Sequence, residues 1–108
     1  MKKFITLVLL ILTLSVTSQI QVVQFNANWN SANGVDWLNK LSDCKINQVD
    51  IAVDKAAQIK YQIIVVPTIV IFNNGEEIKR FQANIMMKME TKLEDIQNLV
   101  DETVMESF

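Results

Sequence analysis

The sequence predicts a single small α/β domain with a mixed central sheet, and three patterns indicate it. Apolar, β-rich runs at residues 20–25 and 46–53 flank a helix-like segment, and a β-α-β order of this kind places its two strands in parallel. Two later strand-like runs are joined by the turn sequence at residues 73–76, which adds an antiparallel pair. An amphipathic pattern follows at residues 86–104. The predicted order is β-α-β-α-β-β-α, a three-layer sandwich with helices on both faces of the sheet.

The first predicted helix follows a polar stretch at residues 26–34. Apolar residues then recur at helical spacing: Val35, Leu38 and Leu41. Ser31 or Asn33 is a suitable N-cap, because a side-chain oxygen there accepts a hydrogen bond from an unpaired N–H group of the first turn. We expect this helix to end near residues 42–44.

The next elements carry clear local signals. Residues 46–53 alternate apolar and polar side chains, the period of a strand. Asp54 then caps a short helix at residues 55–61.

The second half of the domain is predicted as a hairpin followed by a helix. Residues 68–72 form a β-branched and aromatic run typical of a buried central strand. Asn74 and Gly75 suit a type I′ turn, since both tolerate positive φ, and residues 77–81 are the returning strand. The final helix is predicted from a run of apolar residues spaced by three and four: Met86, Met89, Leu93, Ile96, Val100 and Val104.

The N-terminus has the features of a secretory signal. Lys2 and Lys3 precede an apolar stretch at residues 4–16, and small residues favour cleavage after Ser18. The apolar stretch is shorter than the ~20 residues of a spanning helix. An uncleaved anchor extended by the apolar residues of 20–25 is the alternative, but the glutamines interleaved there suit a strand better. We therefore expect residues 1–18 to be a signal peptide, residues 19–108 to be the domain, and the mature protein to be secreted or periplasmic, without stable membrane insertion.

Composition excludes several classes of function. The chain of 108 residues has no His and one Cys, so Ser-His and Cys-His nucleophile pairs, an internal disulfide and His-ligated metals are excluded. Its formal net charge of −2 argues against nucleic-acid binding, which requires a clustered basic surface. We expect no cofactor and no metal.

Three stretches resemble the thioredoxin family. Residues 22–29 are similar to its first core strand and the Trp that precedes its active site. Residues 49–61 are similar to the next strand and helix, and residues 61–76, which include Val66-Pro67-Thr68 and Asn-Gly-Glu, carry the strongest likeness. The resemblance covers roughly residues 20–104 and implies a minimal thioredoxin-like fold, because nothing precedes the first strand and the first helix is about two turns short.

The resemblance also shows what this chain lacks. Where that family has Trp-Cys-Gly-Pro-Cys, residues 29–33 read Trp-Asn-Ser-Ala-Asn, so Asn30 and Asn33 replace both cysteines. Thiol–disulfide exchange requires a thiolate to attack and a thiol to leave, and an amide supplies neither. The family's buried proton-relay acid matches Gln24, which does not titrate, and its lysine neighbour falls near Gln48.

The resemblance implies that one functional feature is retained, a surface that faces a bound peptide. It implies that Pro67 is cis and that Val66 presents backbone groups to an extended peptide, beside Trp29. The alternative is that a cis turn before a central strand serves folding alone. Four loop asparagines surround Trp29: Asn26, Asn28, Asn30 and Asn33. The favoured interpretation is that they are caps and solvated loop residues, and the alternative is that they recognise peptide backbone or a polar ligand.

Sulfur-containing residues offer further candidates. Cys44 is either a monothiol redox site or a small apolar residue at a helix–strand junction. Met86, Met87 and Met89 pack in the core, form an adaptable binding surface with Trp29, or bind copper(I).

The favoured function is a non-redox module that binds a protein or an extended peptide, or acts in a chaperone-like way. Two alternatives stay open: a monothiol thiol–disulfide oxidoreductase that uses Cys44, and a structural subunit of a larger complex.

Overall fold

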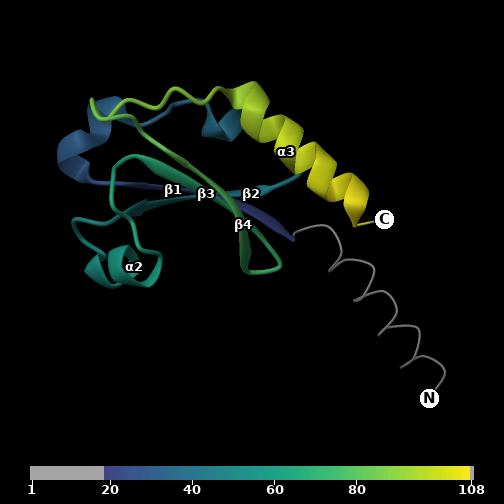
Figure 1. Ribbon diagram of the computed structural model, residues 1–108, viewed down its shortest axis with the longest axis horizontal. Coiled ribbons are helices and arrows are strands. Elements are labelled where there is room, and N and C mark those ends of the chain that lie inside the picture. The colour runs from purple at the N-terminus through teal and green to yellow at the C-terminus, as the bar shows by residue number, and fades with distance from the viewer. Residues whose placement is uncertain (1–18, 108) are drawn as a thin grey trace, which may run out of the picture.

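The central sheet has four strands in the order β2-β1-β3-β4 (Figure 1). This is seen in a computed structural model that describes residues 19–107. The predicted signal peptide lies outside the described residues. The strands are β1 (Ile20–Asn26), β2 (Lys45–Asp50), β3 (Thr68–Asn73) and β4 (Glu76–Gln82). β1 runs parallel to β2 and antiparallel to β3, and β3 pairs antiparallel with β4, which confirms the predicted mixed sheet.

Two helices cover opposite faces of this sheet (Figure 1). α2 (Lys55–Lys60) packs on the face to which Val23 and Phe25 point, and α3 (Leu93–Glu106) packs on the face that carries Val22. Successive residues of a strand point to opposite faces, so the continuous apolar run of β1 supplies both cores. The three-layer α/β sandwich is therefore present.

Several local predictions are confirmed. Asp54 caps α2, with its Oδ1 accepting from the N–H of Ala57 at 3.0 Å. Asn74 and Gly75 both have positive φ, at 55° and 83°, as the hairpin turn requires. β3 is buried along almost its whole length because it lies between β1 and β4.

The prediction of a first α-helix between β1 and β2 is wrong. Within residues 19–107, the connection from β1 to β2 contains two 3₁₀ segments, η2 (Asn28–Asn33) and η3 (Leu38–Lys40), and no α-helix. Side chains compete for the backbone here: the N–H of Val35 donates to Oε1 of Gln24 instead of to a helical carbonyl. Neither Ser31 nor Asn33 caps a helix that follows, since the residue before η3 is Trp37 and makes no side-chain cap.

The predicted start of the last helix is also wrong. Residues 83–92 are irregular, and α3 begins only at Leu93. Asn84 Oδ1 accepts from the N–H groups of Met86 and Lys88, which holds the loop in a turn, and Met87 has a φ of 60°. Asp95 then accepts from the N–H of Lys92 and fixes the helix start.

β2 is shorter than predicted. It ends at Asp50 because Oδ1 of that residue accepts from the N–H of Ala52 and bends the chain into a turn, so residues 51–53 leave the sheet. In residues 19–107, no helix is long and apolar enough to cross a membrane.

Candidate functional site

Asn30 lies buried where η2 meets the loop before β3. It is 5% exposed, and its Nδ2 donates to the carbonyl of Val66 at 3.3 Å. The same Nδ2 donates to Oδ1 of Asn26 at 3.1 Å. Residues 36 positions apart in sequence are thus joined through a single amide. The structure brings together two of the predicted site residues, Asn30 and Val66.

The amides form a closed network. Asn33 Nδ2 donates to Oδ1 of Asn30 at 2.8 Å, and Asn26 Nδ2 donates to the carbonyl of Asn30 at 3.1 Å. Asn30 therefore uses its side-chain donor, its side-chain acceptor and its carbonyl. A buried polar side chain without these partners would cost about 1–3 kcal/mol, so the network stabilises this loop geometry.

The Val66–Pro67 peptide bond is cis, as the resemblance implies. Three successive carbonyls of this loop accept internal hydrogen bonds. Thr68 Oγ1 donates to Val65 at 2.7 Å, Asn30 Nδ2 to Val66, and the N–H of Ala83 to Pro67 at 3.0 Å. In contrast, the N–H of Val66 donates to no group within residues 19–107. Val66 is 7% exposed and Pro67 is buried, so the cis-proline loop offers an outside ligand one donor and little surface.

Gln24 and Gln48 are direct partners across β1 and β2. Gln24 is 2% exposed, and its Oε1 accepts from the N–H of Val35 at 2.9 Å. Neither amide changes charge with pH. Gln24 holds the backbone of Val35, and both glutamines line a pocket, but neither can relay a proton.

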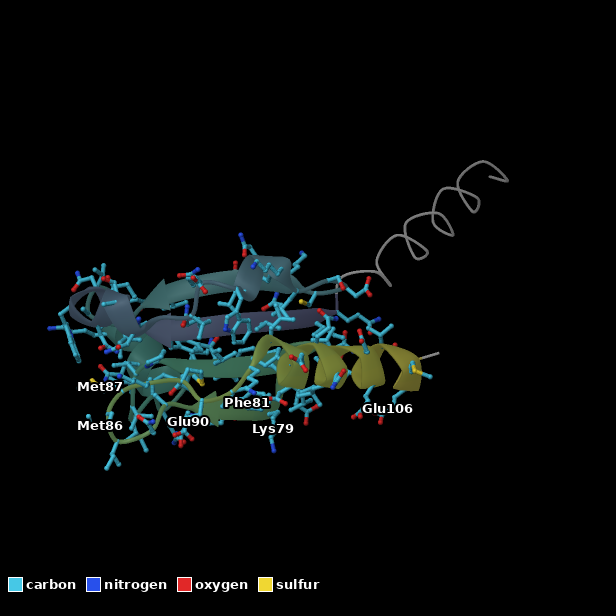
Figure 2. The ribbon with its side chains drawn as sticks, turned by 90° about the horizontal axis from the view of Figure 1, so that it is seen from above. Lys79, Phe81, Met86, Met87, Glu90 and Glu106 are labelled. Atoms are coloured by element: carbon cyan, nitrogen blue, oxygen red, sulfur yellow. The ribbon has the colours of Figure 1, made fainter. Side chains whose placement is uncertain are left out.

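Trp29 lies on η2, at the carboxyl end of β1, and is exposed, with 67% of its surface accessible. The loop after β4 lies at the same end, where Figure 2 shows Met86 and Met87 beyond the end of the sheet, far from Glu106. Ile85 and Met86 are 98% and 68% exposed. Met89 instead packs against the core beneath α3. We call the exposed residues Trp29, Ile85, Met86 and Met87 the apolar end.

Cys44 lies at the opposite end of the parallel pair. Gln21 pairs with Lys45, so Cys44 sits beside the start of β1, whereas η2 follows its end. The seven residues of β1 separate them by about 20 Å. The half-buried thiol packs against the α3-side core. Burial raises the pKa of the Cys44 thiol, and the charge of Asp43 raises it further. A monothiol redox site requires the opposite shift.

Metal binding finds no support in the part of the chain that the structure describes. Within residues 19–107, no three His, Cys, Asp or Glu side chains lie close enough together to hold an ion. Among the three methionines, Met86 and Met87 are exposed, whereas Met89 packs against the α3-side core.

Sequence reasoning missed two groups that build this site. Asn26 was grouped only with the loop asparagines, yet its spacing of four residues from Asn30 is what lets their amides pair. Thr68 was predicted only as the start of a strand, yet its hydroxyl ties down the carbonyl of Val65. The spacing of the asparagines was a usable signal, whereas the Thr68 contact depends on the turn geometry.

Comparisons with known proteins agree on architecture. No protein-family model and no curated protein matches the sequence. Solved structures do match: a mutant thioredoxin of Halobacterium salinarum NRC-1 is 18% identical with a TM-score of 0.60, covering 82% of this chain and 77% of its own. Fasciola hepatica thioredoxin is 24% identical with a TM-score of 0.54, covering 91% and 89%. Schistosoma mansoni thioredoxin is 19% identical with a TM-score of 0.57, covering 80% and 78%. Together with the sheet order and the helices on both faces, these matches show that the chain has a thioredoxin-like fold.

Proposed function

We propose that this protein is a binding module that takes up an extended peptide segment of a partner protein at the apolar end and performs no dithiol redox chemistry. The observation that carries the proposal is the amide network of Asn26, Asn30 and Asn33 beside Val66. At the position that resembles a dithiol motif, hydrogen bonds replace thiols and hold the loop in a defined shape.

The peptide would lie across Trp29 toward the cis-proline loop. Trp29 offers a large, rigid apolar surface with few torsions to restrict on binding. The methionines of the loop after β4 add flexible, polarisable contacts. The N–H of Val66 is the donor for one backbone carbonyl of the peptide. Because the carbonyl of Val66 already accepts from Asn30, the peptide forms one backbone hydrogen bond to this residue rather than two.

The test of binding is a peptide array followed by titration of the strongest peptides. Trp29→Ala should weaken binding at least about tenfold, since buried aromatic anchors carry about 2 kcal/mol or more at interfaces. Met105→Ala is the matched control, because Met105 is 74% exposed and lies on α3, away from the apolar end. Equal loss in both variants, or none in Trp29→Ala, would show that the apolar end is not the binding surface.

The redox half of the proposal has its own test. Reduction of a protein disulfide by dithiothreitol should proceed at the same rate with and without the protein, because neither Asn30 nor Asn33 supplies a thiolate. Acceleration that persists in Cys44→Ser would contradict the proposal. Acceleration that Cys44→Ser abolishes would revive the monothiol alternative, which the raised pKa of Cys44 argues against.

Export remains a prediction from the composition of residues 1–18, and we propose that these residues direct secretion and are removed. The expected result is a secreted or periplasmic protein whose first residue is Gln19. N-terminal sequencing and intact mass of the protein from the exported fraction check this. A full-length protein retained in membranes would support the uncleaved anchor instead.

A further inference from the structure

An open pocket with a volume of about 190 Å³ lies at the carboxyl ends of β1 and β2, against η2. Its wall includes neither Val66 nor Pro67, so it is distinct from the cis-proline loop. The polar groups that matter here are on three elements: Gln24 of β1, Asn28 and Ser31 of η2, and Gln48 and Asp50 of β2. Ligands commonly bind beyond the carboxyl ends of parallel strands, where loops diverge and leave space. We call this space the amide cavity.

Gln24 directs an unused donor into the amide cavity. Its side chain is almost fully buried, and its Oε1 is fixed by the N–H of Val35. The Nε2 group must therefore point the other way, and no hydrogen bond joins it to another group within residues 19–107. It is reached by solvent, because Asn73 Oδ1 is the only buried side-chain N or O atom without a partner in that range. A ligand that brings an acceptor oxygen would replace water at this donor.

Asp50 gives the amide cavity its only charge. Its Oδ1 accepts from the N–H groups of Asn28 and Ala52, at 3.2 and 2.9 Å. Its Oδ2 has no donor among residues 19–107, and no Lys or Arg lines the cavity. A carboxylate in such surroundings favours a ligand that brings a cationic donor, because the hydrogen bond is then charge-assisted.

The two groups stand at a suitable separation. Gln24 pairs with Gln48, so Asp50 is the diagonal neighbour two residues further along β2, with side chains on the same face of the sheet. Strand spacing and rise place these Cα atoms about 8 Å apart. Because both residues line the amide cavity, a small bifunctional group bound there can contact both side chains.

We propose that the amide cavity binds an α-amino acyl group. The α-ammonium donates to Oδ2 of Asp50, and the adjacent carbonyl or carboxylate oxygen accepts from Nε2 of Gln24. Both the N-terminal residue of a peptide and a free amino acid carry this chemistry. The inference does not depend on peptide binding at the apolar end, since Trp29 is not part of the cavity wall.

The experiment is an NMR titration of the ¹⁵N-labelled protein at neutral pH with three probes: alaninamide, alanine and N-acetylalaninamide. Alaninamide should shift the Asn28 and Ser31 amides and the Gln24 side-chain amide saturably, with a dissociation constant in the roughly millimolar range for so small a ligand. N-acetylalaninamide keeps the carbonyl but lacks the ammonium and should cause no saturable shift. If alanine binds with the same dissociation constant as alaninamide, the natural ligand is a free amino acid. If alaninamide binds more tightly than alanine, the natural ligand is the N-terminus of a peptide.

Asp50→Asn is the decisive variant, because it keeps Oδ1 for the N–H groups of Asn28 and Ala52 and removes only the charge. It should weaken alaninamide about tenfold. Glu102→Gln makes the same charge change at an exposed position of α3 and should have no effect. Unchanged binding in Asp50→Asn, equal binding of the acetylated probe, or no saturable shift would each overturn the proposal. If Asp50→Asn does not fold, the comparison of charged and acetylated probes on the unaltered protein decides.

Discussion

The two ends of the parallel pair β1–β2 differ in the functional groups that they carry. The carboxyl end carries Asn30 and Asn33, whose amides bond to each other and to the carbonyl of Val66. The amino end carries Cys44, a thiol packed among apolar side chains with its pKa raised by burial. The fold thus keeps a precise loop where redox chemistry would need a thiolate, and keeps its thiol where no such loop exists. The shape of a site and its reactivity are therefore separable in this fold.

The sharpest way to break this comparison is to return thiols to the carboxyl end. In the variant Asn30→Cys/Asn33→Cys, the two introduced side chains replace amides that now meet at 2.8 Å. We expect them to form a disulfide on oxidation, and the variant to accelerate dithiothreitol-driven reduction of a protein disulfide roughly tenfold or more over the unaltered protein.

Thiol titration before and after oxidation checks that prediction. Both introduced thiols should disappear on oxidation while Cys44 remains. The variant Asn30→Ser/Asn33→Ser is the matched control and should stay inactive. If the introduced cysteines remain reduced under oxidising conditions, the loop does not have the geometry of a dithiol site.

The next prediction removes the amide network. Asn30→Leu deletes its side-chain bonds to Asn26, Asn33 and Val66 and leaves the buried carbonyl of Val66 without its donor. The free energy of unfolding should fall by about 2–4 kcal/mol. Chemical denaturation with an unchanged m-value measures it. Asn33→Ala loses one of these bonds at a more exposed position and should cost about 1 kcal/mol; equal losses would show that burial of the Val66 carbonyl is unimportant.

The smallest predicted effect is at the amino end. Because the folded protein raises the pKa of Cys44, the unfolded chain loses its thiol proton first as pH rises. The contribution of this thiol to stability is constant below the unfolded pKa of about 8.5 and decreases between that value and the higher folded pKa. The unaltered protein should therefore lose stability relative to Cys44→Ala above about pH 8.5. Denaturation of both proteins at several pH values tests this, and a gap that does not depend on pH would refute it.

The fold was predictable where a segment carries one dominant local sequence signal that no other contact overrides. β3, the Asn74–Gly75 turn and the Asp54 cap each have one dominant local signal, and the structure keeps all three. The 3₁₀ segments between β1 and β2 were not predictable, because the apolar spacing there is helical but the side chain of Gln24 on β1 accepts from the backbone N–H of Val35. The predicted start of α3 was wrong for a similar reason, since Asn84 Oδ1 accepts from two backbone N–H groups of the loop after β4.

The residues of the candidate site were predictable, but the hydrogen bonds that join them were not. The resemblance placed Asn30, Val66 and Pro67 near one another. It did not indicate that Asn30 would occupy the carbonyl of Val66, because that contact depends on the orientation of one buried amide. The amide cavity had no sequence signal, since Gln24 and Asp50 meet only through strand register.

The amide network also fixes how the site responds to its surroundings. Carboxamides neither gain nor lose protons between mildly acidic and alkaline solution, and they exchange no electrons with glutathione or other cellular thiols. The contacts between Asn30, Asn33 and Val66 are therefore the same in an oxidising compartment and in a reducing one. The backbone of this loop, including the carbonyl of Val66, is therefore held by contacts that neither a change of redox potential nor a change of pH removes.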